Sequence, residues 1–177
     1  MRDVKEVLLD EETLARRIAE MGQQITKDYV NRDLVLLCVL KGSLFFTSDL
    51  MRHIDLPVTL DFIASSSYGE STRTSGVVRI LKDVEERVED RHVLIVEDIV
   101  DTGLTLSYLI RALKLRKPAS IRTATLLDKP ARRRIEVPVD YAGFKVDDQF
   151  VVGYGLDFAG RYRMLPAVCV LKDELYS

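Results

Sequence analysis

Apolar runs alternate with amphipathic segments along most of the chain. The runs 34–40 and 93–97 are almost wholly apolar, as is typical of strands buried on both faces of a parallel sheet. Further strands are expected at 58–64, 77–84 and 121–127. Helices are expected from Asp10 to Tyr29, over 43–54 and over 104–115, where apolar positions recur every three to four residues. This alternation predicts an α/β domain with a mainly parallel sheet.

The pattern changes after Asp128. Short strand-like pieces follow at 139–144, 149–155 and 166–171. They predict a small hood subdomain, roughly 128–165, on a single domain that spans 1–177. A polar loop is expected at 65–76, between two of the strands.

Composition narrows the function. The net charge of -2 over 177 residues gives no electrostatic footprint for nucleic acid, and no apolar run reaches the roughly 20 residues that span a bilayer. The N-terminus carries charges throughout and does not resemble a signal peptide, so a cytoplasmic protein is expected. Cys38 and Cys169 lie in apolar runs and are interpreted as buried thiols, with a disulfide or a nucleophile as the alternative. Since His53 and His92 are isolated, acid–base chemistry falls to carboxylates.

The stretch VLIVEDIVDTGLTL, residues 93–106, places Glu97, Asp98 and Asp101 directly after a buried strand. Buried carboxylates are costly unless they meet a cation or hydrogen-bond donors. The turn 101–105 offers a glycine, two threonine hydroxyls and the free amides of a helix start, which together suit a phosphate. Capping of the helix is the alternative, although three acids in five positions exceed what a cap needs. The stretch matches neither a Walker A loop nor a GxGxxG motif.

These residues resemble the 5-phosphoribosyl 1-pyrophosphate (PRPP) signature of the type I phosphoribosyltransferases. The third acid, Asp101, is similar to that of the hypoxanthine phosphoribosyltransferase branch, and the resemblance extends from about Leu34 to Leu171. It implies the fold of that family, a Mg²⁺ cofactor, and Asp101 as the general base at purine N7. It also implies a set of residues that hold the 5'-phosphate and ribose: Glu97, Asp98, Asp101, Thr102, Gly103, Leu104 and Thr105.

The resemblance assigns two further loops. Leu40-Lys41-Gly42 matches the pyrophosphate loop, with a cis bond between Leu40 and Lys41, and Arg163 matches an arginine that meets pyrophosphate. Ser67 and Tyr68 match the serine–tyrosine pair of a mobile lid. Without the resemblance, these segments are an ordinary turn and a flexible loop.

The purine pocket is implied by two separate motifs. Lys129, at a position that looks exposed, matches the residue that donates to the 6-oxo group, while Pro130 replaces a basic residue of some relatives. Phe150 would stack on the base, and Val151 would bind the base edge through its backbone. Asp157 would reach the purine edge through its backbone and a second magnesium ion through its carboxylate, while Glu97 and Asp98 are the other expected metal ligands. A solvated lysine and a core aromatic residue are the alternatives. Arg132 to Arg134 are interpreted as a solvated face or a subunit contact.

The resemblance implies salvage of hypoxanthine, and of guanine, to IMP and GMP by a homodimer or homotetramer. One alternative is a PRPP-sensing, RNA-binding regulator with the same fold, which the near-neutral charge disfavours. Another is a phosphoribosyltransferase for a different base. Lys129 and Phe150 disfavour adenine and orotate, whereas xanthine stays open.

Overall fold

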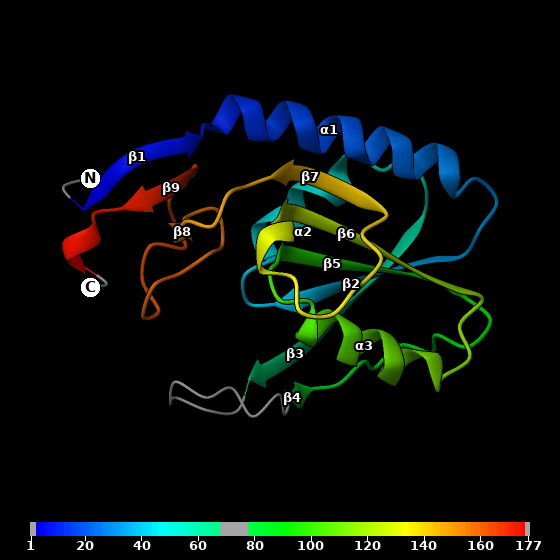
Figure 1. The fold of residues 1–177 in the computed structure, drawn as a ribbon. Helices are drawn as coiled ribbons and strands as arrows, with labels where there is room; N and C mark the ends of the chain where they lie inside the picture. Colours follow the sequence, from blue (N-terminus) through cyan, green and yellow to red (C-terminus); the bar gives the residue numbers. More distant parts are fainter. Residues whose placement is uncertain (1–2, 68–77, 176–177) are drawn as a thin grey trace.

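The computed structural model describes residues 3–67 and 78–175 (Figure 1). A six-stranded sheet in the order β4-β3-β2-β5-β6-β7 forms its centre. All neighbouring strands are parallel except the β3–β4 pair. The strands are β2 (Leu34–Leu40), β3 (Val58–Ser67), β4 (Val78–Lys82), β5 (His92–Val100), β6 (Ser120–Asp128) and β7 (Tyr141–Lys145). The predicted mainly parallel sheet is confirmed.

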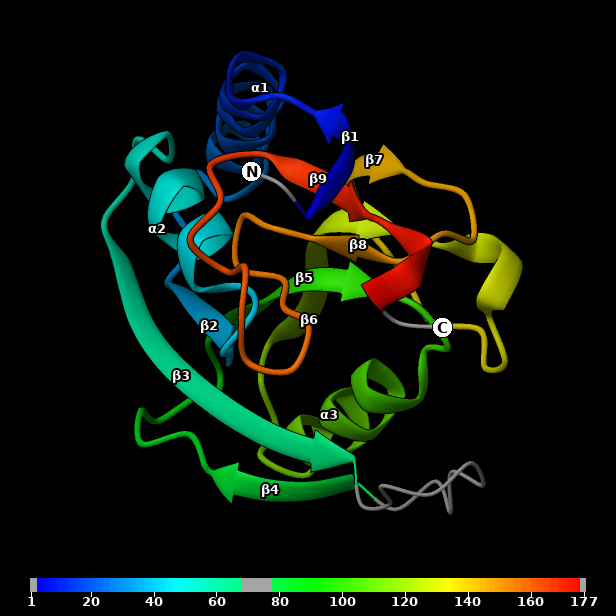
Figure 2. The ribbon, with the colours of Figure 1, turned by 90° about the vertical axis from the view of Figure 1, so that its left-hand side faces the viewer.

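Helices cover both faces of this sheet (Figures 1 and 2). α1 (Glu11–Asp28) and α2 (Leu44–Arg52) lie on one face, and α3 (Leu104–Lys114) lies on the other. The alternation of side chains along each strand divides the core accordingly. Leu36 and Leu94 pack with α1 and α2, whereas the next residues along, Leu37 and Ile95, pack with α3. Apolar residues therefore fill β2 throughout and β5 from Val93 to Val96.

A second, antiparallel sheet has the order β1-β9-β8 and lies at one end of the molecule, at the left in Figure 1. It comprises β1 (Val4–Leu9), β8 (Val151–Val152) and β9 (Val168–Leu171). Of the segment 128–165, only β8 enters this small sheet, while β7 joins the main sheet. The segment also contains a 3-10 turn, Pro130–Arg132, and a second such turn, Asp173–Leu175, follows β9.

Two predictions of local structure were wrong. The strand β1 was not predicted, because its charged residues Lys5 and Glu6 interrupt the apolar positions and register shifts break its pairing with β9. Residues 65–67 were expected in a loop but continue β3, where they pair with β4. The lid residue Tyr68 lies outside the described residues. Among the described helices, none is both long and apolar enough to cross a membrane.

Candidate active site

The carboxyl ends of β2 and β5 open into a pocket of about 720 Å³. In a parallel sheet this edge collects the loops that follow each strand, and ligands bind there. The helix α3 begins directly at the pocket, and the loop after β8 closes the opposite side. Eleven of the predicted site residues line it: Lys41, Gly42, Glu97, Asp98, Asp101, Thr102, Gly103, Leu104, Thr105, Asp157 and Arg163.

The turn between β5 and α3 requires a glycine. Gly103 has φ of +82° at the N-cap of α3, and a Cβ there would overlap the carbonyl oxygen of Ile135. The Thr102 hydroxyl accepts from the Leu104 amide at 3.4 Å. The amides of Thr102 and Gly103 donate to no oxygen within residues 3–67 and 78–175. The turn can therefore direct amides and the positive end of the α3 dipole at an anion.

Glu97 and Asp98 concentrate negative charge at the floor of the pocket. Burial, reinforced by the neighbouring Asp98, raises the pKa of Glu97 well above its usual value, and Glu97 is only 6% exposed. Burial raises the pKa of Asp98 to about 6, although its carboxylate accepts from the Ile99 amide at 2.8 Å. Neither carboxylate forms an ion pair within the described residues, so both would gain from a cation.

The loop after β2 packs against this floor. The Leu40–Lys41 peptide bond is cis, as the family resemblance implied. A methyl group on Gly42 would overlap the Asp98 carboxylate, and one on Gly155 would overlap the Gly42 carbonyl. The loop after β2 and the loop after β8 therefore contact each other through backbone atoms.

Arg163 and Asp157 pair with each other at the rim, at 2.6 Å. Arg163 also donates to the Gly155 carbonyl, and Asp157 accepts from the Gly160 amide at 2.7 Å. In the described part of the chain, no three histidine, cysteine or acidic side chains converge as a ready-made metal site. Glu97, Asp98 and Asp157 thus suit a cation whose coordination is completed by ligand oxygens rather than by the protein alone.

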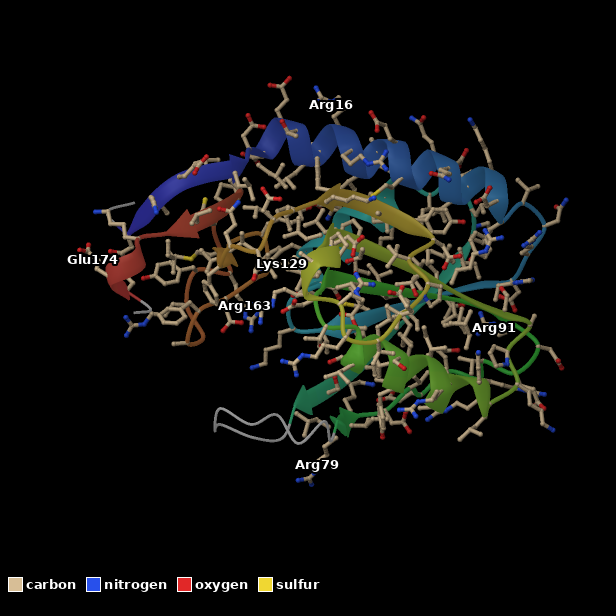
Figure 3. The ribbon with its side chains drawn as sticks, in the orientation of Figure 1. Arg16, Arg79, Arg91, Lys129, Arg163 and Glu174 are labelled. Carbon is tan, nitrogen blue, oxygen red and sulfur yellow. The ribbon has the colours of Figure 1, made fainter. Side chains whose placement is uncertain are left out.

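Lys129 is buried, not exposed as expected. It is 6% exposed, and its Nζ donates to the Gln149 carbonyl at 2.6 Å. Burial lowers the pKa of its ammonium group. Phe150 is 39% exposed and meets Phe158 edge to face at 5.5 Å. Figure 3 shows Lys129 and Arg163 toward the same end of the main sheet, facing the small sheet.

Arg132 is exposed, as the interpretation as a solvated face or a subunit contact expects, but it also lines the pocket. Its Nε lies 3.1 Å from the Asp101 carboxylate, and its NH1 lies 3.2 Å from Asp148. Arg134 also lines the pocket. The 3-10 turn at 130–132 folds the chain back, so that both arginines approach the β5–α3 turn. No signal in the sequence distinguished these arginines from those of a solvated surface.

A model of the phosphoribosyl transferase domain matches residues 5–159. The chain belongs to the phosphoribosyltransferase family. The hypoxanthine-guanine phosphoribosyltransferase of Bacillus subtilis is 48% identical over 99% of this chain and 97% of the relative. The bifunctional protein TilS/HprT of Listeria monocytogenes is equally similar, at 48%, but this chain spans only about a quarter (27%) of its length.

Solved phosphoribosyltransferases share the fold. A hypoxanthine phosphoribosyltransferase from Staphylococcus aureus superposes with a TM-score of 0.96, at 46% identity, over 99% of this chain and 96% of that one. The hypoxanthine phosphoribosyl transferase of Trypanosoma cruzi gives 0.94 at 44% identity, over 99% and 95%. The predicted type I phosphoribosyltransferase fold is confirmed.

Proposed function

We propose that this phosphoribosyltransferase makes IMP and GMP from hypoxanthine and guanine, with PRPP as the ribosyl donor and Mg²⁺ as cofactor. The observation that carries the proposal is the single pocket that joins the turn 101–105, the Lys41-Gly42 loop and the Glu97–Asp98 pair. Relatives whose names specify this reaction match nearly the full chain.

The sugar phosphate would span the pocket floor. The turn from Asp101 to Thr105 would hold the 5'-phosphate with backbone amides and hydroxyls, and Glu97 and Asp98 would accept from the ribose hydroxyls. Lys41, Gly42 and Arg163 would meet the pyrophosphate. Purine N9 would then attack C1 of the ribose as the C1–O bond to pyrophosphate breaks.

Asp101 would accept the proton that the purine loses at N7, which makes it the general base. Its carboxylate is 37% exposed at the pocket and pairs with Arg132 in the free protein. Binding of the purine would therefore replace the Asp101–Arg132 ion pair with a contact between Asp101 and the purine.

Lys129 would distinguish 6-oxo from 6-amino purines, since an ammonium group donates and cannot accept. Its present partner, the Gln149 carbonyl, is the same kind of acceptor as a purine oxygen. Phe150 would stack on the base, while Val151 and Asp157 would bind its edge through backbone groups. Ser67, with Tyr68, stays a prediction for the lid.

The donor set fits magnesium. Two carboxylates with raised pKa values and no cationic partner among the described residues are stabilised by a divalent ion. Bound there, magnesium would neutralise charge on the leaving pyrophosphate. Glu97, Asp98 and Asp157 are the proposed protein ligands.

A homodimer or homotetramer is part of the proposal. Phe45 and Met164 are 43% and 65% exposed and line one hollow of about 510 Å³ between α1, α2 and the loop before β9. Arg163 borders this hollow and the pocket alike, so a second copy seated there would abut the site. Sedimentation of Met164→Glu against the parent protein tests this: the variant should shift toward monomer. A cytoplasmic location stays a prediction.

The decisive experiment incubates the protein with PRPP, Mg²⁺ and one base at a time, and follows nucleotide formation. Hypoxanthine and guanine should both react, and adenine should not. If only xanthine reacts, the substrate is xanthine rather than hypoxanthine and guanine. Failure of all four bases, with PRPP still bound, would favour a PRPP sensor over an enzyme.

A further inference from the structure

Arg133 is a nearly buried arginine beneath the β5–α3 turn, and none of the roles proposed above uses it. Its side chain is 10% exposed and pairs with the Asp128 carboxylate, whose side chain is 12% exposed. A buried charge of this kind is retained only when its donors find acceptors. The Asp128 carboxylate is one acceptor, and the turn itself supplies the others.

The remaining donors of Arg133 hold two successive backbone carbonyls of the turn. Its Nε donates to the Asp101 carbonyl at 3.1 Å, and its NH2 donates to the Val100 carbonyl at 3.4 Å. Next along the chain, the Thr102 carbonyl accepts from the amides of Arg134 and Ile135 at 2.9 and 3.1 Å. Three carbonyls in a row are thus held from one side.

This arrangement dictates where the turn's amides point. In a planar trans peptide, the N–H points opposite to the C=O of the preceding residue. Within the described residues, the only cis peptide is Leu40–Lys41, so the turn is trans. Holding the Asp101 and Thr102 carbonyls against Arg133 and its neighbours therefore turns the amides of Thr102 and Gly103 away from them, toward the pocket.

We propose that Arg133 is a positioning residue for the reaction: it fixes the peptide planes that present amides to the 5'-phosphate and sets the backbone from which the Asp101 carboxylate projects. The inference rests on the proposed function for its chemistry, but the backbone geometry stands independently of it. The rival explanation is that Arg133 only neutralises Asp128.

Two variants separate these explanations. Arg133→Lys keeps the positive charge beside Asp128 but loses the fork that reaches two carbonyls. Asp128→Leu combined with Arg133→Met removes both buried charges together, a change that leaves no lone charge behind and is often neutral for stability. The double variant keeps the proposal testable if the lysine variant does not fold.

A matched control is available at the far end of α3. Arg116 bonds both Asp83 carboxylate oxygens at 2.6 Å and the Val84 carbonyl at 3.4 Å, so it uses the same kind of fork outside the pocket. Arg116→Lys should therefore leave turnover within about two-fold of the parent protein, because surface pairs of this kind contribute little.

The first readout is steady-state kinetics with PRPP, Mg²⁺ and hypoxanthine. Loss of positioning should lower kcat/KM for PRPP by about 10- to 100-fold in both Arg133 variants, as displacements near 1 Å do. Melting temperature should change little in the double variant. Parental kcat/KM in the double variant would overturn the proposal and leave charge neutralisation as the only role of Arg133.

The second readout does not need catalysis. Ribose 5-phosphate is titrated into ¹⁵N-labelled protein while the Thr102 and Gly103 amide resonances are followed. Parent and Arg116→Lys should bind alike, and the Arg133 variants should bind about 10-fold more weakly. Equal binding in all four proteins would overturn the inference. If the parent binds ribose 5-phosphate but transfers no ribosyl group to any base, the proposed function fails while this result still decides the role of Arg133.

Discussion

Asp98→Asn should make the free protein more stable at neutral pH while it abolishes catalysis. Burial raises the pKa of the Asp98 carboxyl to about 6 from an ordinary value of 3.8. A carboxyl whose pKa is raised on folding disfavours the folded state once it is ionised. This cost is fully present above pH 6, shrinks as the pH falls through 6, and vanishes below about 4. The neutral asparagine avoids it at every pH.

The size of the gain follows from the shift. A shift from 3.8 to about 6 corresponds to about 3 kcal/mol. The Asp98 side chain keeps partial solvent contact, so we expect about 1–2 kcal/mol. An asparagine oxygen can still accept from the Ile99 amide, and the repulsion that raises the pKa of the neighbouring Glu97 disappears. In a chain of this size, the gain is about 2–8 °C in melting temperature.

Urea unfolding without magnesium at pH 7.5, 6.0 and 4.5 measures the effect. Asp55→Asn, which removes one exposed carboxylate far from the pocket, controls for net charge. Asp98→Asn should exceed the parent in free energy of unfolding at pH 7.5, and the difference should shrink toward pH 4.5. Equal or lower stability at pH 7.5, or a difference that does not depend on pH, would refute the reasoning. Adding PRPP and Mg²⁺ should stabilise the parent more than the variant.

The other predictions concern individual groups of the site. Asp101→Asn should lower kcat by about 10²- to 10⁴-fold with PRPP affinity and melting temperature kept; a mere helix cap would instead lose about 0.5–2 kcal/mol of stability and keep turnover. Lys129→Met should raise KM for hypoxanthine and guanine and narrow the preference over adenine, and unchanged selectivity would remove Lys129 from base recognition. Gly42→Ala should lower kcat/KM for PRPP at least about 100-fold, since the added methyl overlaps the Asp98 carboxylate. Excess EDTA should stop turnover, and full activity in its presence would remove magnesium from the proposal.

The main sheet was predictable because burial on both faces gives its central strands continuous apolar runs. Leu34 to Leu40 carries this signal within seven residues. The small sheet lacks such a long apolar run. β8 has only two residues, and β1 pairs with β9, which lies near the other end of the chain. Strands stabilised by such distant partners leave little trace in local periodicity.

The same distinction divides the site. The acids and the glycine around the β5–α3 turn were predictable from the sequence. Carboxylates such as Glu97 and Asp98 at the end of a buried strand do not stabilise the fold, so their presence indicates a functional site. Arg132 and Arg133 were not, because a run of arginines is the usual sign of a solvated surface. Their roles depend on the 3-10 turn at 130–132, which brings them to Asp101 and Asp128. Neither residue type nor spacing alone encodes that fold-back.

In the free protein, two of the cationic side chains proposed to bind substrates already have partners, whereas Glu97 and Asp98 have no cationic partner among the described residues. Lys129 donates to the Gln149 carbonyl, and Arg163 pairs with Asp157. A 6-oxo base would offer Lys129 an oxygen in place of the Gln149 carbonyl. A 6-amino base would instead leave the buried ammonium group without an acceptor, which costs about 1–3 kcal/mol or more. On the proposed function, selectivity would therefore arise from the contact that the wrong base fails to restore. At the floor, Asp98 accepts from the Ile99 amide but would gain a cationic partner only when a metal ion binds, so the same pocket would both reject the wrong base and favour the metal-bound donor.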